Sequence, residues 1–285
     1  MASDRSAVVT RFAPSPSGYL HLGHAYAALF AWRAGEQAGG RCLLRIEDLD
    51  AARCHPRFEA AILEDLAWLG MSWDGPPLRQ SERMAHYTAA LERLQAEGFV
   101  YPCFCTRREI RAEIARAPQA PHGPDGPLYP GACRGLSAAE REDRIAAGAA
   151  YALRLDAAAA AARAGPLTWR DEAKGDLAAE TQALGDVVLA RKDLGASYHL
   201  AVTVDDAAQE VTLVTRGEDL LPSTHVHRLL QALLGLPVPR WHHHRLLTDG
   251  AGERLAKRSD SLAIRALREA GRSAAEVRAL AAIED

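Results

Sequence analysis

The spacing of apolar residues predicts alternating strands and helices over the first hundred positions. Residues 7–12 form a short β-branched run that ends in a Pro/Gly-rich loop, and a helical pattern begins near Ala25. A second apolar run covers 42–46 and leads into an acidic segment at 47–50. A strand, a helix and a strand in succession predict a right-handed parallel unit. Two amphipathic helices follow, with apolar residues at helical spacing: Phe58, Ile62, Leu66 and Leu69, then Met84, Tyr87, Leu91 and Leu94.

The pattern changes after residue 100. Cysteines, a Pro/Gly-rich run and an Ala-rich helical region follow in turn, which is typical of an inserted domain. Apolar runs at 187–190, 200–204 and 211–214 then predict that the strands of the parallel sheet resume. Ser223 and Thr224 can cap a helix that follows them. We therefore predict an α/β fold with a Rossmann-type parallel sheet in two halves, 1–100 and 187–240, separated by an insertion at 101–186 and followed by a tail at 241–285.

Composition places the chain among ordinary globular proteins, since 48% of its residues are hydrophobic and 25% are charged. The N-terminus has no basic segment followed by an apolar one, and no apolar run is long enough to span a bilayer. We therefore expect a cytoplasmic protein with no membrane partner. A net charge of −3 argues against broad, sequence-blind binding of nucleic acid. An RNA partner would need a local basic surface.

Five cysteines, an odd number, favour reduced thiols or metal ligands over a disulfide framework in a chain without an export signal. Three of them cluster, in CFC at 103–105 and YPGAC at 129–133. Cys103, Cys105 and Cys133 with the Tyr129 phenolate could form a tetrahedral zinc site, although tyrosine is an uncommon ligand. His122 is a rival fourth ligand, and buried free thiols are the alternative interpretation.

Two histidines three positions apart mark the first predicted turn from strand to helix. Gly23 would let a nucleotide approach the backbone between His21 and His24, and the helix N-terminus adds partial positive charge, so the turn suits a phosphate. The alternative is that His21 caps the helix and His24 is a surface residue. No Gly-x-Gly-x-x-Gly supports a dinucleotide site. The histidines at 242–244 cannot all point one way on a strand, so we assign no metal to them.

Five motifs, in order, resemble those of the class I aminoacyl-tRNA synthetases for glutamate and glutamine. They are RFAPSPSGYLHLGH at 11–24, RIEDLD at 45–50, SYHLA at 197–201 with two aspartates at 205–206, TRGEDL at 215–220 and RLAKRS at 254–259. Within this family the chain most resembles the shortened glutamyl-queuosine tRNA(Asp) synthetases. The last motif departs from the family's lysine loop at Arg254 and Ala256, so only Lys257 carries over as the charged group.

The resemblance implies ATP-dependent activation of L-glutamate, with Mg²⁺ arriving with the ATP. Charge that develops on the phosphates needs fixed donors and cations. The catalytic residues implied are His21, His24 and Lys257, and the ATP site adds Gly23. Glutamate needs a cation for its side chain and an acceptor for its ammonium. For glutamate binding the family implies the clamp Arg11 and Arg216, the acceptor Glu47, the hydroxyl of Tyr198 and the segment Phe12, Ala13, Pro14 and Ser15.

The family's zinc pattern matches Cys103, Cys105, Tyr129 and Cys133 and implies one structural zinc ion. We expect a monomer. Only 28 residues follow Lys257, short of the roughly 40 residues that an independent core needs, so we expect no anticodon-binding domain.

The resemblance implies queuosine in tRNA(Asp) as the acceptor, with basic residues such as Arg107, Arg108 and Arg111 on the phosphates of the anticodon loop. Two alternatives are a truncated glutamyl-tRNA synthetase that charges a tRNA 3′ end and a non-catalytic sensor. The motif residues His21, His24 and Lys257 argue against the sensor.

Overall fold

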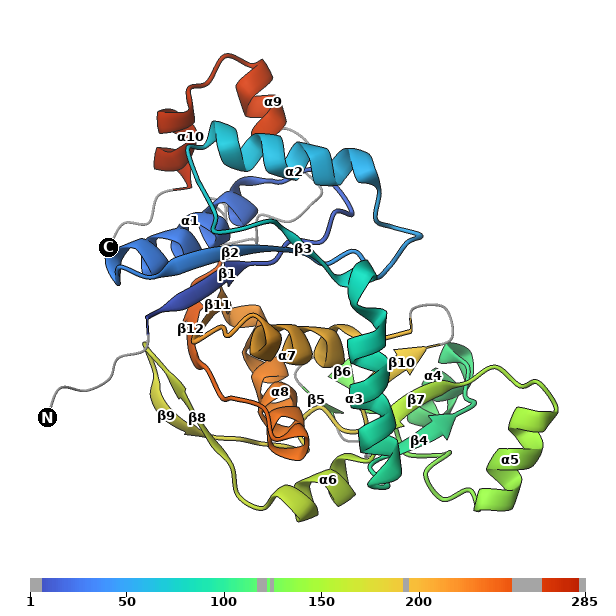
Figure 1. The fold of residues 1–285 in the computed structure, drawn as a ribbon. Coiled ribbons are helices and arrows are strands. Elements are labelled where there is room, and N and C mark those ends of the chain that lie inside the picture. Colours follow the sequence, from blue (N-terminus) through green and yellow to red (C-terminus); the bar gives the residue numbers. More distant parts are fainter. Residues whose placement is uncertain (1–6, 117–121, 124–125, 192–194, 248–262, 282–285) are drawn as a thin grey trace, which may run out of the picture.

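The computed structural model describes residues 7–116, 122–123, 126–191, 195–247 and 263–281. Figure 1 shows the N-terminal strands and helices at one end of the molecule, together with the C-terminal helices α9 (Ile264–Glu269) and α10 (Ala274–Leu280). The middle of the chain lies at the other end. No helix within the described ranges is both long and apolar enough to cross a membrane.

The predicted parallel unit is confirmed at the N-terminal end. β1 pairs in parallel with β2, and β2 pairs in parallel with β3. Position 40, just before β2, requires glycine, because a Cβ there would overlap the carbonyl oxygen of Val8. The elements are β1 (Val9–Phe12), α1 (Leu22–Gln37), β2 (Arg41–Ile46), α2 (Pro56–Trp68) and β3 (Leu78–Arg79).

A second group of strands continues this sheet. β11 pairs in parallel with β12, β12 pairs in parallel with β8, and β9 is antiparallel to β8. Val9 accepts from the amide of Thr212 at 3.0 Å, and Arg11 reaches the carbonyl of Thr215, so β1 and β11 run side by side in one direction. Their carboxyl ends therefore meet at one edge. The strands are β8 (Thr168–Asp171), β9 (Gly175–Ala178), β11 (Leu213–Gly217) and β12 (Arg240–His244).

The inserted region has its own antiparallel sheet, in which β7 pairs with both β4 and β10. Its strands are β4 (Val100–Cys103), β7 (Ala152–Leu155) and β10 (Val188–Arg191), with a short pair β5 (His122–Gly123) and β6 (Gly126–Pro127). Its helices are α4 (Arg107–Arg116), α5 (Ala138–Ala146) and α6 (Ala157–Ala164).

Three local predictions are wrong. Residues 200–204, predicted as a strand, lie in α7 (Tyr198–Ala208), where Leu200, Ala201 and Val202 are all buried. A buried helix gives a continuous apolar run that periodicity alone cannot separate from a strand. Ser223 and Thr224 lie inside α8 (Leu221–Leu234) rather than at its cap. The predicted strand at 187–190 exists as β10 but joins the sheet of the insertion.

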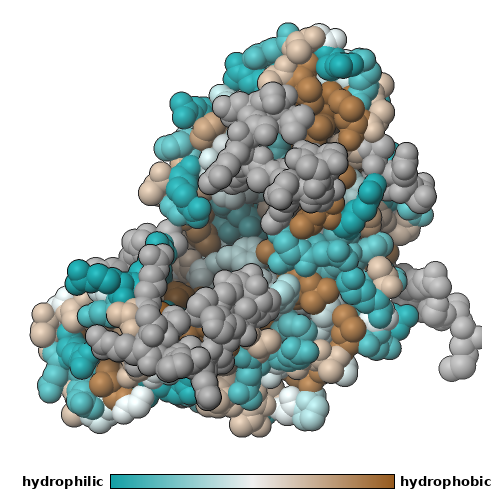
Figure 2. Space-filling view, turned by 180° about the vertical axis from the view of Figure 1, so that it is seen from behind, coloured by the Kyte–Doolittle hydropathy of each residue, from teal (hydrophilic) through white to brown (hydrophobic). Residues whose placement is uncertain are grey.

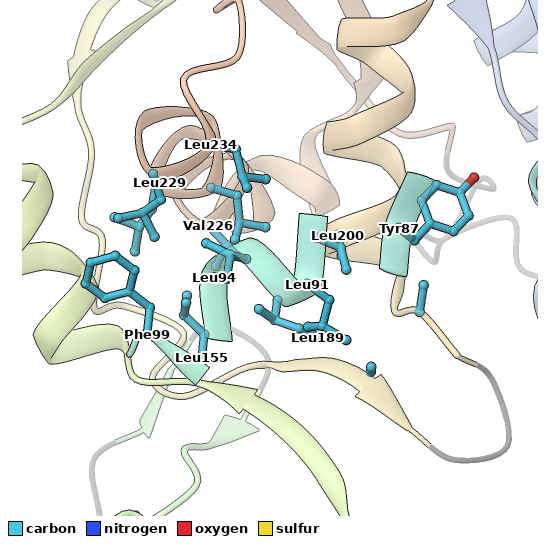
Figure 3. Packing of buried hydrophobic residues seen from close by; sticks show 14 of the residues in the cluster. Tyr87, Leu91, Leu94, Phe99, Leu155, Leu189, Leu200, Val226, Leu229 and Leu234 are labelled. Carbon is cyan, nitrogen blue, oxygen red and sulfur yellow. The ribbon is translucent and has the colours of Figure 1, made fainter. Parts of the chain in front are cut away.

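One hydrophobic core joins the insertion to the helices behind the parallel sheet. Figure 3 shows Leu91 and Leu94 of α3 (Met84–Ala96) close to side chains from α7, α8 and the strands of the insertion. The short 3₁₀ turns η1 (Gln80–Arg83) and η2 (Glu218–Leu220) lead into α3 and α8. Burial of these side chains fixes the insertion against the edge of the sheet where the strands end.

Candidate active site

A cavity of about 510 Å³ opens between the carboxyl ends of the parallel strands and the insertion. Figure 2 shows that the molecule is hollowed between its upper and lower parts on one face. Three residues predicted to bind glutamate line the cavity: Ser15, Glu47 and Tyr198. The insertion contributes Cys105, Arg107, Ala152 and Arg154. The cavity thus brings together segments that are far apart in the sequence.

The two histidines of the first motif form the start of α1. His21 is the N-cap, and its Nδ1 accepts from the amide of Gly23 at 3.1 Å. His24 Nδ1 accepts from the amide of His21 at 3.3 Å, and the rings lie 3.8 Å apart. Because both Nδ1 atoms accept, the ring proton of a neutral imidazole lies on Nε2. The capping role of His21 is therefore present, and both rings keep an N–H donor on the opposite edge.

Arg11 lies in a buried ionic network. Its Nε donates to Asp206 Oδ1 at 2.9 Å and its Nη1 to the Thr215 carbonyl at 3.0 Å. Arg45 donates to the same Asp206 oxygen at 2.7 Å and lies 3.3 Å from Glu47 Oε1. Burial raises the pKa of Glu47, and the charge of Arg45 opposes that shift. The charge of Arg11 is therefore already paired with a carboxylate.

Arg216 is a buried cation with a different environment. It is 6% exposed, and its Nη1 lies 3.3 Å from the Tyr198 hydroxyl. Nε donates to His243 Nε2 at 3.2 Å, and Nη2 donates to the Thr224 hydroxyl. In the described ranges no carboxylate forms an ion pair with it, and burial lowers its pKa. Because a buried unpaired charge is costly, this position favours an anionic ligand group.

Neutral histidines surround this guanidinium. Asp171 Oδ2 lies 2.7 Å from His243 Nδ1, and a carboxylate can only accept, so the proton is on Nδ1 and Nε2 accepts from Arg216. His227 Nδ1 lies 3.2 Å from Arg216 Nη1, which fixes its proton on Nε2, facing His199 Nδ1 at 3.2 Å. Burial, with the nearby Arg216 charge, lowers the pKa of His199 and of His243 to about 4. The histidines therefore add no competing charge at neutral pH.

The three clustered cysteines come together, as predicted. Sγ atoms of Cys103, Cys105 and Cys133 lie within 4.8 Å of one another, and Cys105 Sγ is 3.4 Å from Cys133 Sγ. The Tyr129 hydroxyl is 3.3 Å from Cys103 Sγ and 3.6 Å from Cys105 Sγ. Tetrahedral zinc, with Zn–S bonds of about 2.3 Å, separates its sulfur ligands by about 3.8 Å. These residues fit zinc, whereas the side chain of His122 lies outside the described part of the structure.

Of the remaining predicted residues, those at the end of β1 and after it are described by the structure, and those of the last motif are not. Phe12 packs partly buried in the N-terminal core, and the carbonyl of the buried Pro14 accepts from the amide of Glu47 at 2.9 Å. Ala13 is half-buried in the same segment. Lys257, with its neighbours in the 254–259 motif, lies outside the described residues. The first described residue after it, Ala263, forms a bridge with His21.

Sequence reasoning did not assign Asp171, Thr224 or His227 to the site. Asp171 lies in the segment predicted as insertion, and only the pairing of β8 with β12 brings it to the site. Thr224 and His227 lie on α8. The sequence predicted a helix there, but it did not indicate which way these side chains point. The unusual number of histidines, 11 in all, was the one available signal.

Comparison with known proteins shows which family the chain resembles. The family described as tRNA synthetases class I (E and Q), catalytic domain, matches residues 7–280. A Rhodobacter capsulatus protein named glutamyl-Q tRNA(Asp) synthetase is 52% identical over 96% of this chain and 99% of its own length. Glutamate–tRNA ligase 2 of Acidithiobacillus ferrooxidans is 44% identical, over 94% of this chain and 56% of its own. The crystal structure of an Elizabethkingia meningosepticum glutamate tRNA ligase with its amino acid aligns with a TM-score of 0.74 at 33% identity, over 89% of this chain and 52% of that one.

Proposed function

Because the chain belongs to the class I glutamyl- and glutaminyl-tRNA synthetases, we propose that it activates L-glutamate with ATP without needing tRNA, and transfers the glutamate to queuosine in the anticodon of tRNA(Asp). The observation that carries the activation step is Arg216, a buried cation without a carboxylate partner in the described residues. The queuosine acceptor is supported by the names of relatives that the chain covers over 82% to 99% of their length.

The glutamate side chain binds at Arg216. Its γ-carboxylate replaces the missing ion-pair partner and also accepts from the Tyr198 hydroxyl, which lies 3.3 Å from the guanidinium. The α-ammonium donates to Glu47, whose pKa burial raises and which gains from a second cation. Arg11 belongs to the same clamp, but its charge is shared with Asp206. Arg216 is therefore the principal cation for the substrate side chain.

Activation needs little proton transfer, because the α-carboxylate of glutamate is already ionised at neutral pH. One of its oxygens attacks the α-phosphorus of ATP, a new P–O bond forms, and the bond to pyrophosphate breaks. The Nε2–H groups of His21 and His24 and the start of α1 stabilise the charge on the phosphates. Mg²⁺ bound to ATP neutralises part of the same charge.

Lys257 acts on the departing pyrophosphate. Ala263 follows it by six residues and is bridged to His21. Six residues span at most about 20 Å when fully extended, so a role for Lys257 beside the first motif is compatible with the length of the connecting chain. The charge of the lysine then offsets the charge that develops as pyrophosphate leaves.

Zinc bound by Cys103, Cys105, Tyr129 and Cys133 stabilises the insertion and takes no part in the chemistry. We expect one zinc ion per wild-type chain after metal-replete expression, and none in Cys133→Ser. Metal analysis of both proteins measures this, with Cys42→Ser as the control, because Cys42 is buried in β2 and does not belong to the cluster. A wild-type protein without zinc would mean that these residues are buried thiols and a phenol.

The acceptor is the cyclopentene-diol of queuosine, whose vicinal hydroxyls resemble those of a terminal ribose. A hydroxyl oxygen attacks the acyl carbon of the adenylate, the bond from that carbon to the phosphate oxygen breaks, and AMP leaves with the hydroxyl proton. Arg107 and Arg108 at the start of α4 are exposed and face RNA phosphates, whereas the side chain of Arg111 lies outside the described part. The absence of an anticodon-binding domain stays a prediction of the sequence.

Labelled glutamate distinguishes this acceptor from the 3′ end. We expect label on queuosine-containing tRNA(Asp) and none on unmodified tRNA(Asp) or tRNA(Glu). The label should remain on the anticodon fragment after nuclease removal of the 3′ end. If the label instead tracks the terminal adenosine of tRNA(Glu), the chain is a truncated glutamyl-tRNA synthetase.

A further inference from the structure

A second cavity, of about 540 Å³, adjoins the active-site cavity on the side of the insertion. The two cavities share four lining residues: Cys105, Arg107, Ala152 and Arg191. A ligand that occupies the first cavity can therefore continue into the second. The volume is within the range of about 300–1,000 Å³ of small-molecule sites. We call it the aromatic cavity.

Two rings, Phe104 and Tyr151, form the wall that gives this cavity its name. β4 and β7 are antiparallel, and their last pair is Cys103 with Ala152. Phe104 and Tyr151 are the next residues outward, so they lie opposite each other, with ring centroids 5.7 Å apart. Both are half-buried, which leaves ring surface toward the cavity. Cys103 and Cys105 line the same wall, so a zinc ion bound to the cysteine cluster would hold it in place.

Two arginine side chains line the aromatic cavity. Arg107 and Arg191 are its charged lining residues, and no aspartate or glutamate is among the described residues that line it. The guanidinium of Arg144 on α5 lies 5.5 Å from the Phe104 ring centroid, which covers part of that ring. The Tyr151 ring is therefore the main flat surface, with cations beside it. A flat aromatic ring with arginine side chains beside it suits a nucleobase joined to a phosphate.

We propose that the aromatic cavity binds an unpaired nucleotide that adjoins the acceptor nucleotide in the RNA loop. The base lies against the Tyr151 ring, Phe104 closes the wall, and Arg107 and Arg191 contact the phosphate. Stacking on a ring is sequence-tolerant, and the phosphate contact depends on salt. This inference rests on the proposed function, because it assumes that an RNA loop enters the first cavity.

The test measures binding, independently of glutamate transfer. A fluorescent anticodon stem-loop of tRNA(Asp) that carries queuosine is titrated with wild type and Tyr151→Leu, and each nucleotide beside queuosine is replaced in turn by an abasic one. We expect Tyr151→Leu, or an abasic site at one of the two positions, to weaken binding by roughly 10-fold. The two changes together should weaken it no further than either alone. Tyr151→Phe keeps the ring and should bind like the wild type.

Glutamate-dependent pyrophosphate exchange and zinc content should stay at wild-type values in Tyr151→Leu, because Tyr151 is not among the residues that line the active-site cavity. An unchanged RNA affinity in Tyr151→Leu overturns the proposal. So does a loss of affinity in Tyr151→Leu that multiplies with the loss from an abasic nucleotide at both flanking positions. Phe104→Leu repeats the comparison from the opposite strand. If the binding cycle behaves as expected but no tRNA is glutamylated on queuosine, the cavity assignment stands and the proposed acceptor fails.

Discussion

Arg216→Gln lowers glutamate-dependent pyrophosphate exchange by on the order of 10³-fold, as expected when one partner of a buried charge pair is lost. Most of the effect should be in the KM for glutamate, because the γ-carboxylate would enter the pocket without its cation. The free protein should not be destabilised, since Arg216 has no carboxylate partner among the described residues. Steady-state exchange kinetics and thermal unfolding measure both effects.

Arg240→Gln is the matched control for this variant. Arg240 lies on β12, and its ion pair with Glu172 is solvent-exposed, so its loss should change activity little. The informative comparison is with Arg11→Gln. A larger loss there, together with less than a tenfold change in Arg216→Gln, would place the γ-carboxylate at Arg11 and contradict the assignment.

Lys257→Ala lowers adenylate formation by about 10²-fold, the scale seen when a preorganised transition-state donor is removed. Glutamate binding should be nearly unchanged, because the lysine acts on the phosphates. Single-turnover formation of glutamyl-adenylate separates the two effects. Lys174→Ala is the control, since Lys174 forms a partly exposed ion pair with Glu218. A normal rate in Lys257→Ala would identify Arg254 or Arg258 as the phosphate ligand.

The sequence predicted best where local pattern and motif agreed. The parallel unit of β1, α1 and β2 follows from apolar spacing, and the cysteine cluster follows from residue type and spacing. Prediction from the sequence failed where burial removed the alternation of apolar and polar residues, as in α7. Asp171 could not be found from sequence, because its role depends on the pairing of β8 with β12 across about seventy residues of chain.

The surroundings of Arg216 show what long-range packing adds. Sequence motifs placed Arg11 and Arg216 in one clamp and did not distinguish their roles. In the fold, Asp206 pairs with Arg11, whereas hydroxyls and neutral histidines surround Arg216. The difference arises from side chains on α7, α8 and β12, whose direction no local pattern specifies.

Pyrophosphate exchange with the wild-type protein in the absence of tRNA tests the central claim most directly. We predict exchange with L-glutamate and little with L-glutamine, because a neutral amide leaves the buried charge of Arg216 unpaired. Equal exchange with the two amino acids would contradict the pocket, and exchange only after tRNA is added would contradict tRNA-independent activation.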